Sequence, residues 1–299
     1  MKLRLGMSPI SWSNDDFPQL GGDTPLETCL RETRQAGFTG TETGGKFPTN
    51  AEALAAVLEV HDLALVSGWY SGTMIGNDLA SEKNRITPQL ELFKACGAPV
   101  IVYGETFETV QNRQDKALAS RSKLADFDVR TYGANVTALA EHCAEAGVRL
   151  TFHHHMGTAV ESEEEIDALM AHTGAAVGLL LDTGHLVFGG GEIASVISKH
   201  GARINHVHTK DIRKNVLADI DRDNDSFLDC VLEGVFTVPG DGMIDYHDVI
   251  RRLADVGYEG WVVVEAEQDP VKANPLKYAR IGYDALVSAL TAAGYQLTG

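Results

Sequence analysis

Basic residues are scarce in this 299-residue sequence. Lys and Arg number 25 against 42 Asp and Glu, which gives a formal net charge of −17 at pH 7. A surface with this balance repels phosphate backbones and anionic lipid surfaces. We therefore expect neither a nucleic acid nor a membrane as a partner of this protein.

Cysteine is also scarce, and long apolar runs are missing. The four cysteines lie far apart with no C-x-x-C pair, so they indicate neither a zinc knuckle nor a disulfide framework. No segment approaches the ~20 apolar residues of a membrane-spanning helix, and the N-terminus lacks the apolar stretch and cleavage site of a signal peptide. The sequence predicts a soluble, cytoplasmic protein with reduced thiols.

Apolar runs alternate with helical patterns along the whole chain. Hydrophobic residues make up 44% of the sequence, which is enough for one large core. The alternation predicts parallel strands joined by right-handed crossovers, and eight such units predict a (β/α)8 TIM barrel of the α/β class. A doubly wound open sheet is the alternative, because alternation alone does not show closure. The predicted strands lie near residues 3–10, 38–42, 63–69, 99–105, 149–154, 177–182, 204–211 and 261–267.

The domain organisation follows from the absence of a linker. No stretch rich in Pro, Gly or Ser divides the chain, so residues 1–299 are expected to form a single catalytic domain. The polar stretch at about 211–245 is long for a connection between a strand and a helix. We expect it to form a lid-like insertion over the active site, and the simpler interpretation is a surface insertion.

Acidic residues end two of the most apolar runs. Active sites of parallel barrels lie at the carboxyl ends of the strands, where Asp182 ends VGLLLD and Glu265 ends WVVVE. Charged side chains are rarely buried unless a cation accompanies them. With His208 they form an oxygen and nitrogen ligand set that suits manganese, cobalt, iron or zinc better than calcium. We predict Asp182, His208 and Glu265 as metal ligands, with a fourth ligand from the fifth strand.

Three consecutive histidines follow the fifth apolar run. Because side chains alternate along a strand, His153 and His155 share one face, and His154 points to the other, where it can bond a neighbouring helix. A single histidine at a strand end is more often structural than catalytic, but here three predicted ligands lie at neighbouring strand ends. His153 or His155 is our first prediction for a general base, since histidine titrates near neutral pH without tuning.

The other strand ends supply the residues predicted to act on or bind the substrate. Lys46 and Glu267 are predicted as further catalytic groups, with Lys46 or the second histidine as the acid. Trp12 and Asn14 are predicted to wall the pocket, the indole against C–H groups and the amide against a hydroxyl. The groups predicted to orient substrate hydroxyls are Glu42, His185 and Lys210.

Six stretches, spread from the first strand to the last, resemble the inosose dehydratases, a family within the xylose isomerase-like barrel superfamily. They are SPISWSNDDFPQLGG, AGFTGTETGGKFP, HHHMGT, LLLDTGHLVFGGG, HVHTKD and VVVEAEQDP. The resemblance implies dehydration of 2-keto-myo-inositol (scyllo-inosose) to a trihydroxycyclohexane-1,2-dione in inositol catabolism, with manganese or cobalt. It also implies glutathione, which no residue of the sequence indicates. Many superfamily members carry a ligand glutamate at the end of the fifth strand, where this chain has histidines, so the fourth ligand stays open.

Three other functions are compatible with such a barrel. A sugar or polyol isomerase or epimerase would share the removal of a proton beside a carbonyl. A nuclease of the endonuclease four type would use a related barrel with a zinc cluster, but the acidic balance argues against it. A polyol-binding sensor would keep the pocket without the chemistry. A homo-oligomer is the default expectation, although no stretch identifies an interface.

Overall fold

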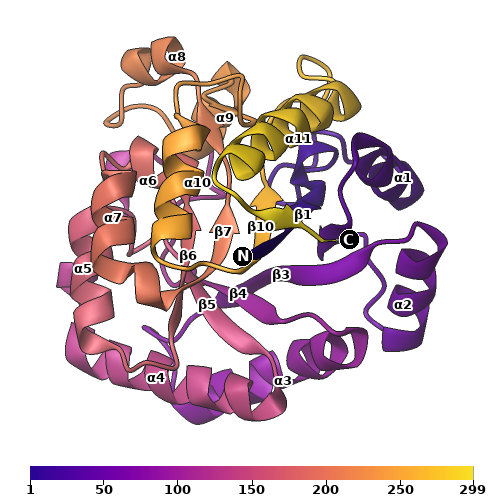
Figure 1. Cartoon of the computed structure of the whole chain (residues 1–299). Helices are drawn as coiled ribbons and strands as arrows, with labels where there is room; N and C mark the ends of the chain where they lie inside the picture. The colour runs from indigo at the N-terminus through magenta and orange to yellow at the C-terminus, as the bar shows by residue number, and fades with distance from the viewer. Residues whose placement is uncertain (299) are drawn as a thin grey trace.

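Eight parallel strands close into a barrel in the computed structural model, which describes residues 1–298 (Figure 1). They are β1 (Lys2–Met7), β2 (Gly40–Thr43), β3 (Ala64–Gly72), β4 (Val100–Glu105), β5 (Arg149–His153), β6 (Gly178–Asp182), β7 (Ile204–His208) and β10 (Gly260–Val264). The ring closes because β10 pairs with β7 on one side and with β1 on the other, where Leu5 is level with Val262. The predicted TIM barrel is confirmed, and the open-sheet alternative is wrong.

Helices form an outer ring around the strands (Figure 1). They are α1 (Leu26–Ala36), α2 (Ala51–Val60), α3 (Leu79–Cys96), α4 (Val129–Ala146), α5 (Glu163–His172), α6 (Thr183–Phe188), α7 (Ile193–His200), α10 (Tyr246–Asp255) and α11 (Pro275–Ala292). Short 3-10 turns occur at Pro9–Ser11, Leu118–Ser120, Leu124–Asp126 and Gly201–Arg203. No helix in residues 1–298 is both long enough and apolar enough to cross a membrane.

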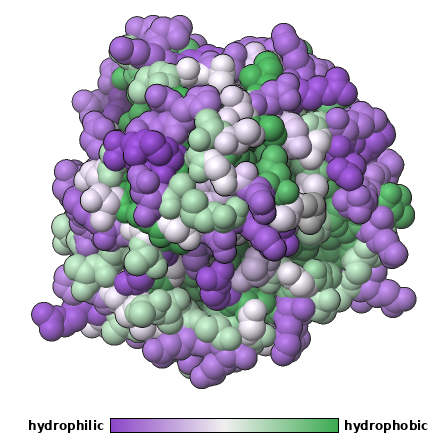
Figure 2. Space-filling view, viewed as in Figure 1, coloured by the Kyte–Doolittle hydropathy of each residue, from purple (hydrophilic) through white to green (hydrophobic). Residues whose placement is uncertain are grey.

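The start of α5 shows how local sequence defines these helices. Ser162 accepts a hydrogen bond from the Glu165 amide, while the Glu165 carboxylate accepts from the Ser162 amide, which is a complete capping box. The acidic run around it complements the positive end of the helix. Figure 2 shows such hydrophilic residues along most of the outline of the molecule, with hydrophobic residues lying between them.

The interior of the barrel depends on a glycine in β2. A Cβ atom at Gly40 would lie 2.5 Å from a methyl group of Val66 and 2.6 Å from the indole of Trp261. Those two side chains form a small buried cluster with Val263, separate from the large core between strands and helices. A larger residue at position 40 would therefore displace the packing that supports the strand ends above it.

Residues 211–245 form a compact layer of their own. The segment contains β8 (Asp211–Ile212), α8 (Lys214–Asp219), α9 (Phe227–Glu233) and β9 (Phe236–Thr237), and β8 pairs with β9 antiparallel. Its apolar side chains pack with Leu118, Met156 and Phe188. Backbone hydrogen bonds from Leu118 and Ala119 to residues 225 and 222 fasten it to the connection between β4 and α4. Helices α8 and α9 appear at the top of Figure 1.

Several strand boundaries differ from the prediction. The runs expected to end at 211 and 267 end as strands at His208 and Val264, so the polar residues beyond them belong to loops. The short strands β8, β9 and β11 (Gln296–Leu297) were not predicted, because two-residue strands leave no periodic pattern. The strand β11 pairs with β1 at the edge of the barrel.

Candidate active site

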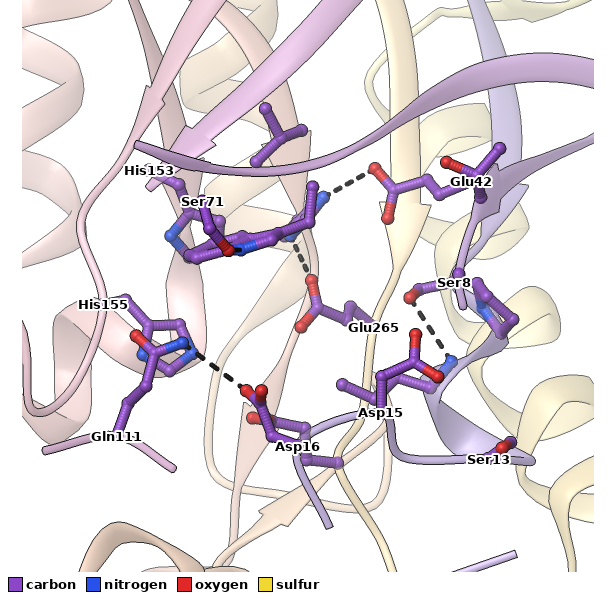
Figure 3. A pocket seen from close by; sticks show the side chains of 18 residues that line it. Ser8, Ser13, Asp15, Asp16, Glu42, Ser71, Gln111, His153, His155 and Glu265 are labelled. Carbon is purple, nitrogen blue, oxygen red and sulfur yellow. Dashed lines mark hydrogen bonds and ion pairs between the residues drawn. The ribbon is translucent and has the colours of Figure 1, made fainter. Parts of the chain in front are cut away.

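A cavity of about 280 Å³ opens at the carboxyl ends of the strands. Its wall includes the strand-end side chains Glu42, His153, His208 and Glu265, together with residues of the loops that follow β1, β4 and β10. In the close-up of Figure 3, His153 and His155 lie on one side of the view and Glu42 and Ser8 on the other. This is the end of the barrel where the sequence predicted the site.

Four of these strand-end residues could hold one metal ion. His153, Asp182, His208 and Glu265 each offer a ligand atom, and these atoms all lie within 4.8 Å of one another. The Oδ2 atom of Asp182 lies 3.7 Å from Nε2 of His153 and 3.6 Å from Nδ1 of His208. Nδ1 of His208 also contacts Oε2 of Glu265. The side chains of the three predicted ligands thus converge, and the fourth candidate beside them is His153, where many superfamily members are expected to have a glutamate.

Hydrogen bonds on the far side of each imidazole fix which nitrogen faces this ligand set. Nδ1 of His153 donates to the carbonyl oxygen of His154 at 2.5 Å, which leaves the lone pair of Nε2 toward Asp182. Nε2 of His208 donates to Oε1 of Glu42 at 2.9 Å, which leaves Nδ1 toward Asp182 and Glu265. Ligating histidines commonly have such a second partner, because it sets the tautomer and the ring orientation.

The ligand set fits a divalent cation. Asp182 is fully buried, and its Oδ2 has no hydrogen-bond partner among the described residues. An uncompensated buried carboxylate is costly, and burial raises the pKa of Asp182 accordingly. Two imidazole nitrogens and two carboxylates are donors suited to manganese, cobalt, iron or zinc. Burial lowers the pKa of His208, but Glu42 and Glu265 outweigh it and raise the pKa above its usual value, so this imidazole lies where a cation is favoured.

Glu42 supports the ligand set from behind. Its Oε1 accepts hydrogen bonds from His208, from Nε2 of His206 at 3.0 Å and from the hydroxyl of Ser67 at 2.5 Å. Burial would raise the pKa of Glu42, but His208 and His206 lower it to about 2. Glu42 was predicted to orient a substrate hydroxyl. It does line the cavity, but one of its oxygens is already engaged by His208.

Lys210 forms the centre of a second buried cluster. Its ammonium lies 2.8 Å from Nε2 of His185, 2.6 Å from Oε2 of Glu267 and 2.9 Å from Oε1 of Glu265. Burial lowers the pKa of Lys210, but Glu265 and Glu267 raise it above its usual value. Glu267 reaches the cavity wall, whereas Lys210 and His185 lie behind it. Burial raises the pKa of Glu267 to about 7.

His155 lines the cavity, as the alternation of the strand predicted. Its ring centroid lies 4.0 Å from that of His185 and 5.0 Å from that of Phe227 in α9. Nδ1 donates to the carbonyl oxygen of Met156 at 2.8 Å, which leaves the lone pair on Nε2. Burial, with the charge of Lys210, lowers the pKa of His155 to about 4, so the expectation that this ring titrates near neutral pH was wrong, and the imidazole is neutral there.

His154 does point away from the cavity, but the expected bond to a neighbouring helix is absent. Both ring nitrogens are buried, and neither has a hydrogen-bond partner within residues 1–298. Burial lowers the pKa of His154 to about 3, so the ring is a neutral part of the core. The prediction of a hydrogen bond was wrong because the alternation rule gives the face and says nothing of a partner.

Three residues predicted from the sequence lie outside the cavity wall. The indole Nε1 of Trp12 donates to Glu32 at 2.7 Å, and only 1% of this side chain is exposed. The ammonium of Lys46 is held by the carbonyl oxygens of Thr24 at 2.5 Å and Gly21 at 3.3 Å. Asn14 accepts hydrogen bonds from the amides of residues 16 and 17, at 2.9 and 3.0 Å, and so shapes the loop after β1.

That loop and its neighbours supply wall residues that sequence reasoning missed. Asp16 accepts a hydrogen bond from the Gln111 side chain at 3.4 Å, and both line the cavity (Figure 3). Trp69, near the end of β3, is the tryptophan of the wall, with its ring centroid 5.6 Å from His153 and 5.7 Å from His155. Its place at the end of LALVSGW was a signal that could have identified it. Gln111 lies in a long loop and had no such signal.

Comparison with known proteins decides the family. The sequence model of the xylose isomerase-like TIM barrel family matches residues 30–296. The chain belongs to this family. Rhizopine catabolism protein MocC of Rhizobium meliloti is 47% identical over 298 residues, covering 100% of this chain and 92% of that protein. Inosose dehydratase of Geobacillus thermodenitrificans is 41% identical over 282 residues, covering 93% of this chain and 94% of that enzyme. The chain's relatives thus include inosose dehydratases, as its motifs predicted.

Solved structures show the same fold at lower identity. The IolI protein with a bound zinc atom aligns with a TM-score of 0.67 at 18% identity, over 96% of this chain and 98% of that one. The probable 3-DHS dehydratase AsbF from Bacillus anthracis aligns with a TM-score of 0.67 at 14% identity, over 95% of this chain and 98% of that one. Both confirm the closed barrel.

Proposed function

We propose that this protein is a metal-dependent hydro-lyase that converts 2-keto-myo-inositol (scyllo-inosose) to a trihydroxycyclohexane-1,2-dione in inositol catabolism. The supporting observation is the convergence of four candidate ligand residues, three of which line the same cavity as His155 and Glu267. The relative named as an inosose dehydratase is 41% identical over 93% of the chain, which supports the same substrate class.

The proposed metal centre consists of His153, Asp182, His208 and Glu265. These residues would hold a divalent ion, which would supply the Lewis acidity that polarising a substrate ketone and stabilising developing negative charge require. Manganese or cobalt is our proposal for the ion, and glutathione is a proposed cofactor on the family resemblance alone. Since His153 belongs to this ligand set, it is not our choice for the base.

His155 is the proposed general base. Loss of water from a ketone with a β-hydroxyl requires removal of the α-proton, and a base must reach that proton through a free lone pair. The bond from Nδ1 of His155 to the Met156 carbonyl places the lone pair on Nε2. The ring lines the cavity and packs against Trp69 and Phe227, and only 5% of the residue is exposed.

Glu267 is the proposed general acid for the departing hydroxyl. Its Oε2 is held by Lys210 at 2.6 Å, so Oε1 is the oxygen available to the cavity. His185 lies 3.8 Å from the same Oε2 and closes the cluster behind it. Lys210 and His185 therefore act on Glu267 and Glu265 rather than on the substrate, in contrast to their predicted role of orienting substrate hydroxyls.

The rest of the cavity is suited to a neutral polyol. Asp15, Asp16 and Gln111 offer hydrogen-bonding groups to hydroxyls, and Trp69 offers an apolar face to the C–H side of a ring. The carboxylates of the wall repel a phosphate group, which argues against sugar phosphates as substrates. We propose residues 211–245 as a lid, since Phe227 from this segment packs on His155.

One assay tests substrate, reaction and metal together. Protein stripped of metal is given manganese or cobalt, with and without glutathione, and 2-keto-myo-inositol is followed by mass and ultraviolet absorbance. Metal-dependent loss of one water with a new diketone absorbance supports the dehydratase. Conversion at unchanged mass identifies the alternative, a sugar or polyol isomerase or epimerase, and binding without turnover identifies a sensor. A homo-oligomer remains a prediction, and native mass spectrometry of the same sample tests it.

A further inference from the structure

We propose that the ammonium of Lys210 is a built-in cation that fills a second metal position and so limits this site to one divalent ion. The proposal rests on the metal centre proposed above, and it concerns a different set of atoms. It assigns to Lys210 a positioning role through Glu265 and Glu267, without contact with the substrate.

The acceptors around Lys210 are those of a metal site. One imidazole nitrogen and two carboxylate oxygens surround its Nζ at 2.8, 2.6 and 2.9 Å, from His185, Glu267 and Glu265. His155 lies close enough to complete the set, because His155, His185 and Glu267 offer ligand atoms within 4.8 Å of one another. Imidazole and carboxylate donors are the ordinary ligands of zinc, manganese and cobalt, at distances of roughly 2.0–2.2 Å. A modest contraction of this set would suit a divalent ion.

Glu265 joins the two positions. Its Oε2 contacts Nδ1 of His208 in the first ligand set, and its Oε1 lies 2.9 Å from Nζ of Lys210. In two-metal enzymes, the ions lie about 3.5–4 Å apart, close enough for one carboxylate to reach both. Glu265 therefore has the arrangement of a bridging ligand, with one of the two cations supplied by the chain itself.

The stem of Lys210 is fixed in this place. The side chain is fully buried, and a Cβ atom at Gly184 would lie 2.6 Å from its Cγ, so the glycine of LDTGH leaves the space that the stem occupies. The ammonium lies 4.9 Å from the ring centroid of Phe236, in cation–π range. The hydroxyl of Thr183 donates to the Lys210 carbonyl at 2.9 Å. The surrounding residues thus hold the ammonium in a buried position that is shaped for it.

Charge balance favours one ion together with one ammonium. The carboxylates of the two sets are those of Asp182, Glu265 and Glu267. When all three are ionised, their three negative charges equal the sum of one divalent ion and Lys210. Protonation of Glu267, which its role as the acid requires, leaves still less negative charge for a second divalent ion. Buried charges persist when they are paired in this way. A second divalent ion would have to displace a tethered ammonium that already has three acceptors, which makes the second position inaccessible in the native chain.

The test counts metal ions. Lys210→Met keeps the length of the side chain and removes its charge, and Lys46→Met is the matched control, since that ammonium contacts only backbone carbonyls. Each protein is stripped, saturated with Mn²⁺, freed of excess ion by gel filtration and analysed for metal per chain by mass spectrometry. Electron paramagnetic resonance then reports whether two Mn²⁺ ions on one chain are coupled.

We expect one ion per chain in the native protein and in Lys46→Met, and two coupled ions in Lys210→Met. The second ion should be lost again when Glu267→Gln is added to Lys210→Met. Two ions in the native protein, or one ion in a folded Lys210→Met, would overturn the proposal. If Lys210→Met fails to fold, Lys210→Ala is prepared in the presence of methylammonium, which supplies the missing cation. Removal of the methylammonium should then allow a second ion to bind. A count of one ion per chain both with and without the amine would contradict the proposal. A native protein with one ion that does not dehydrate the ketone would contradict the proposed function and leave this inference intact.

Discussion

His208 donates from Nε2 to Glu42 at 2.9 Å, and this single bond determines that its Nδ1 faces Asp182 and Glu265. Because Glu42 comes from β2 and His208 from β7, the bond runs across the barrel and links distant parts of the sequence. His206, two residues before His208 in β7, donates to the same oxygen. The orientation of His208, a proposed metal ligand, therefore depends on a residue that only the closed barrel brings beside it.

Glu42→Gln should weaken metal binding without abolishing the site. An amide carries no charge and accepts less strongly from two imidazoles, and loss of such an outer partner typically costs about 10- to 100-fold in metal affinity. Competition with a chromophoric chelator measures this affinity. Glu52→Gln, an exposed position on α2, is the control and should leave it unchanged. An affinity for metal equal to that of the native protein in Glu42→Gln would show that Glu42 does not orient His208.

Asp182→Asn should have opposite effects on the metal-free and metal-loaded protein. Without metal, the substitution removes a buried carboxylate oxygen, Oδ2, that has no hydrogen-bond partner among the described residues. It keeps Oδ1, which accepts from the His185 amide at 2.8 Å, so the midpoint of thermal unfolding should stay level or rise. With metal, the native protein gains about 2.7 kcal/mol at a concentration 100 times the dissociation constant, and the variant should lose that gain. Calorimetry with and without Mn²⁺ measures both. An equal metal-induced shift in both proteins would contradict the assignment of Asp182.

Glu105, away from the cavity, should make stability depend on pH. Burial raises its pKa from 4.5 to about 7, while the hydroxyl of Tyr103 donates to its carboxylate at 2.9 Å. Because the folded state holds the proton more tightly, the stabilisation is complete below pH 4.5 and is lost as the pH rises to about 7. The loss is on the order of 3 kcal/mol. Denaturant unfolding at pH 4.5 and pH 8 measures it.

Glu105→Gln is the informative comparison, since an amide cannot ionise. The free energy of unfolding of the variant should change less between these pH values than that of the native protein, whatever its absolute level. Glu141→Gln, an exposed position on α4, should keep the native profile. Parallel pH profiles for Glu105→Gln and the native protein would contradict a raised pKa at Glu105.

The strand ends were predictable because parallel strands bring them to one place. Asp182 and His208 are level with each other in the register of β6 and β7, so residues that are 26 positions apart become neighbours. Apolar runs ending in Asp, His or Glu therefore indicated three side chains that the structure brings to one point, and their role as metal ligands stays a prediction. The alternation of β5 likewise predicted that His153 and His155 face the cavity together.

The loops were not predictable, because their contacts depend on tertiary structure. Lys46 and Lys210 both follow a strand, but only Lys210 finds carboxylates, since the turn before Lys46 directs its ammonium to the carbonyls of Gly21 and Thr24. Gln111 approaches Asp16 from a loop 95 residues later in the chain. Neither arrangement has a period or a spacing that the sequence would reveal.

Two of the three tryptophans, Trp69 and Trp12, give the last prediction, because Trp69 lines the cavity and Trp12 does not. Trp69→Phe should raise KM for the ketone several-fold with a smaller effect on kcat, since the cavity loses part of an apolar wall and the Nε1 bond to Ser71 at 2.9 Å. Trp12→Phe should leave KM unchanged and lower the free energy of unfolding by about 1–3 kcal/mol, because it removes a partly buried hydrogen bond to Glu32 and leaves a void. Steady-state kinetics and denaturant unfolding of both variants separate the two roles. A rise in KM in Trp12→Phe, with KM unchanged in Trp69→Phe, would contradict this assignment and show that Trp12, rather than Trp69, contacts the substrate.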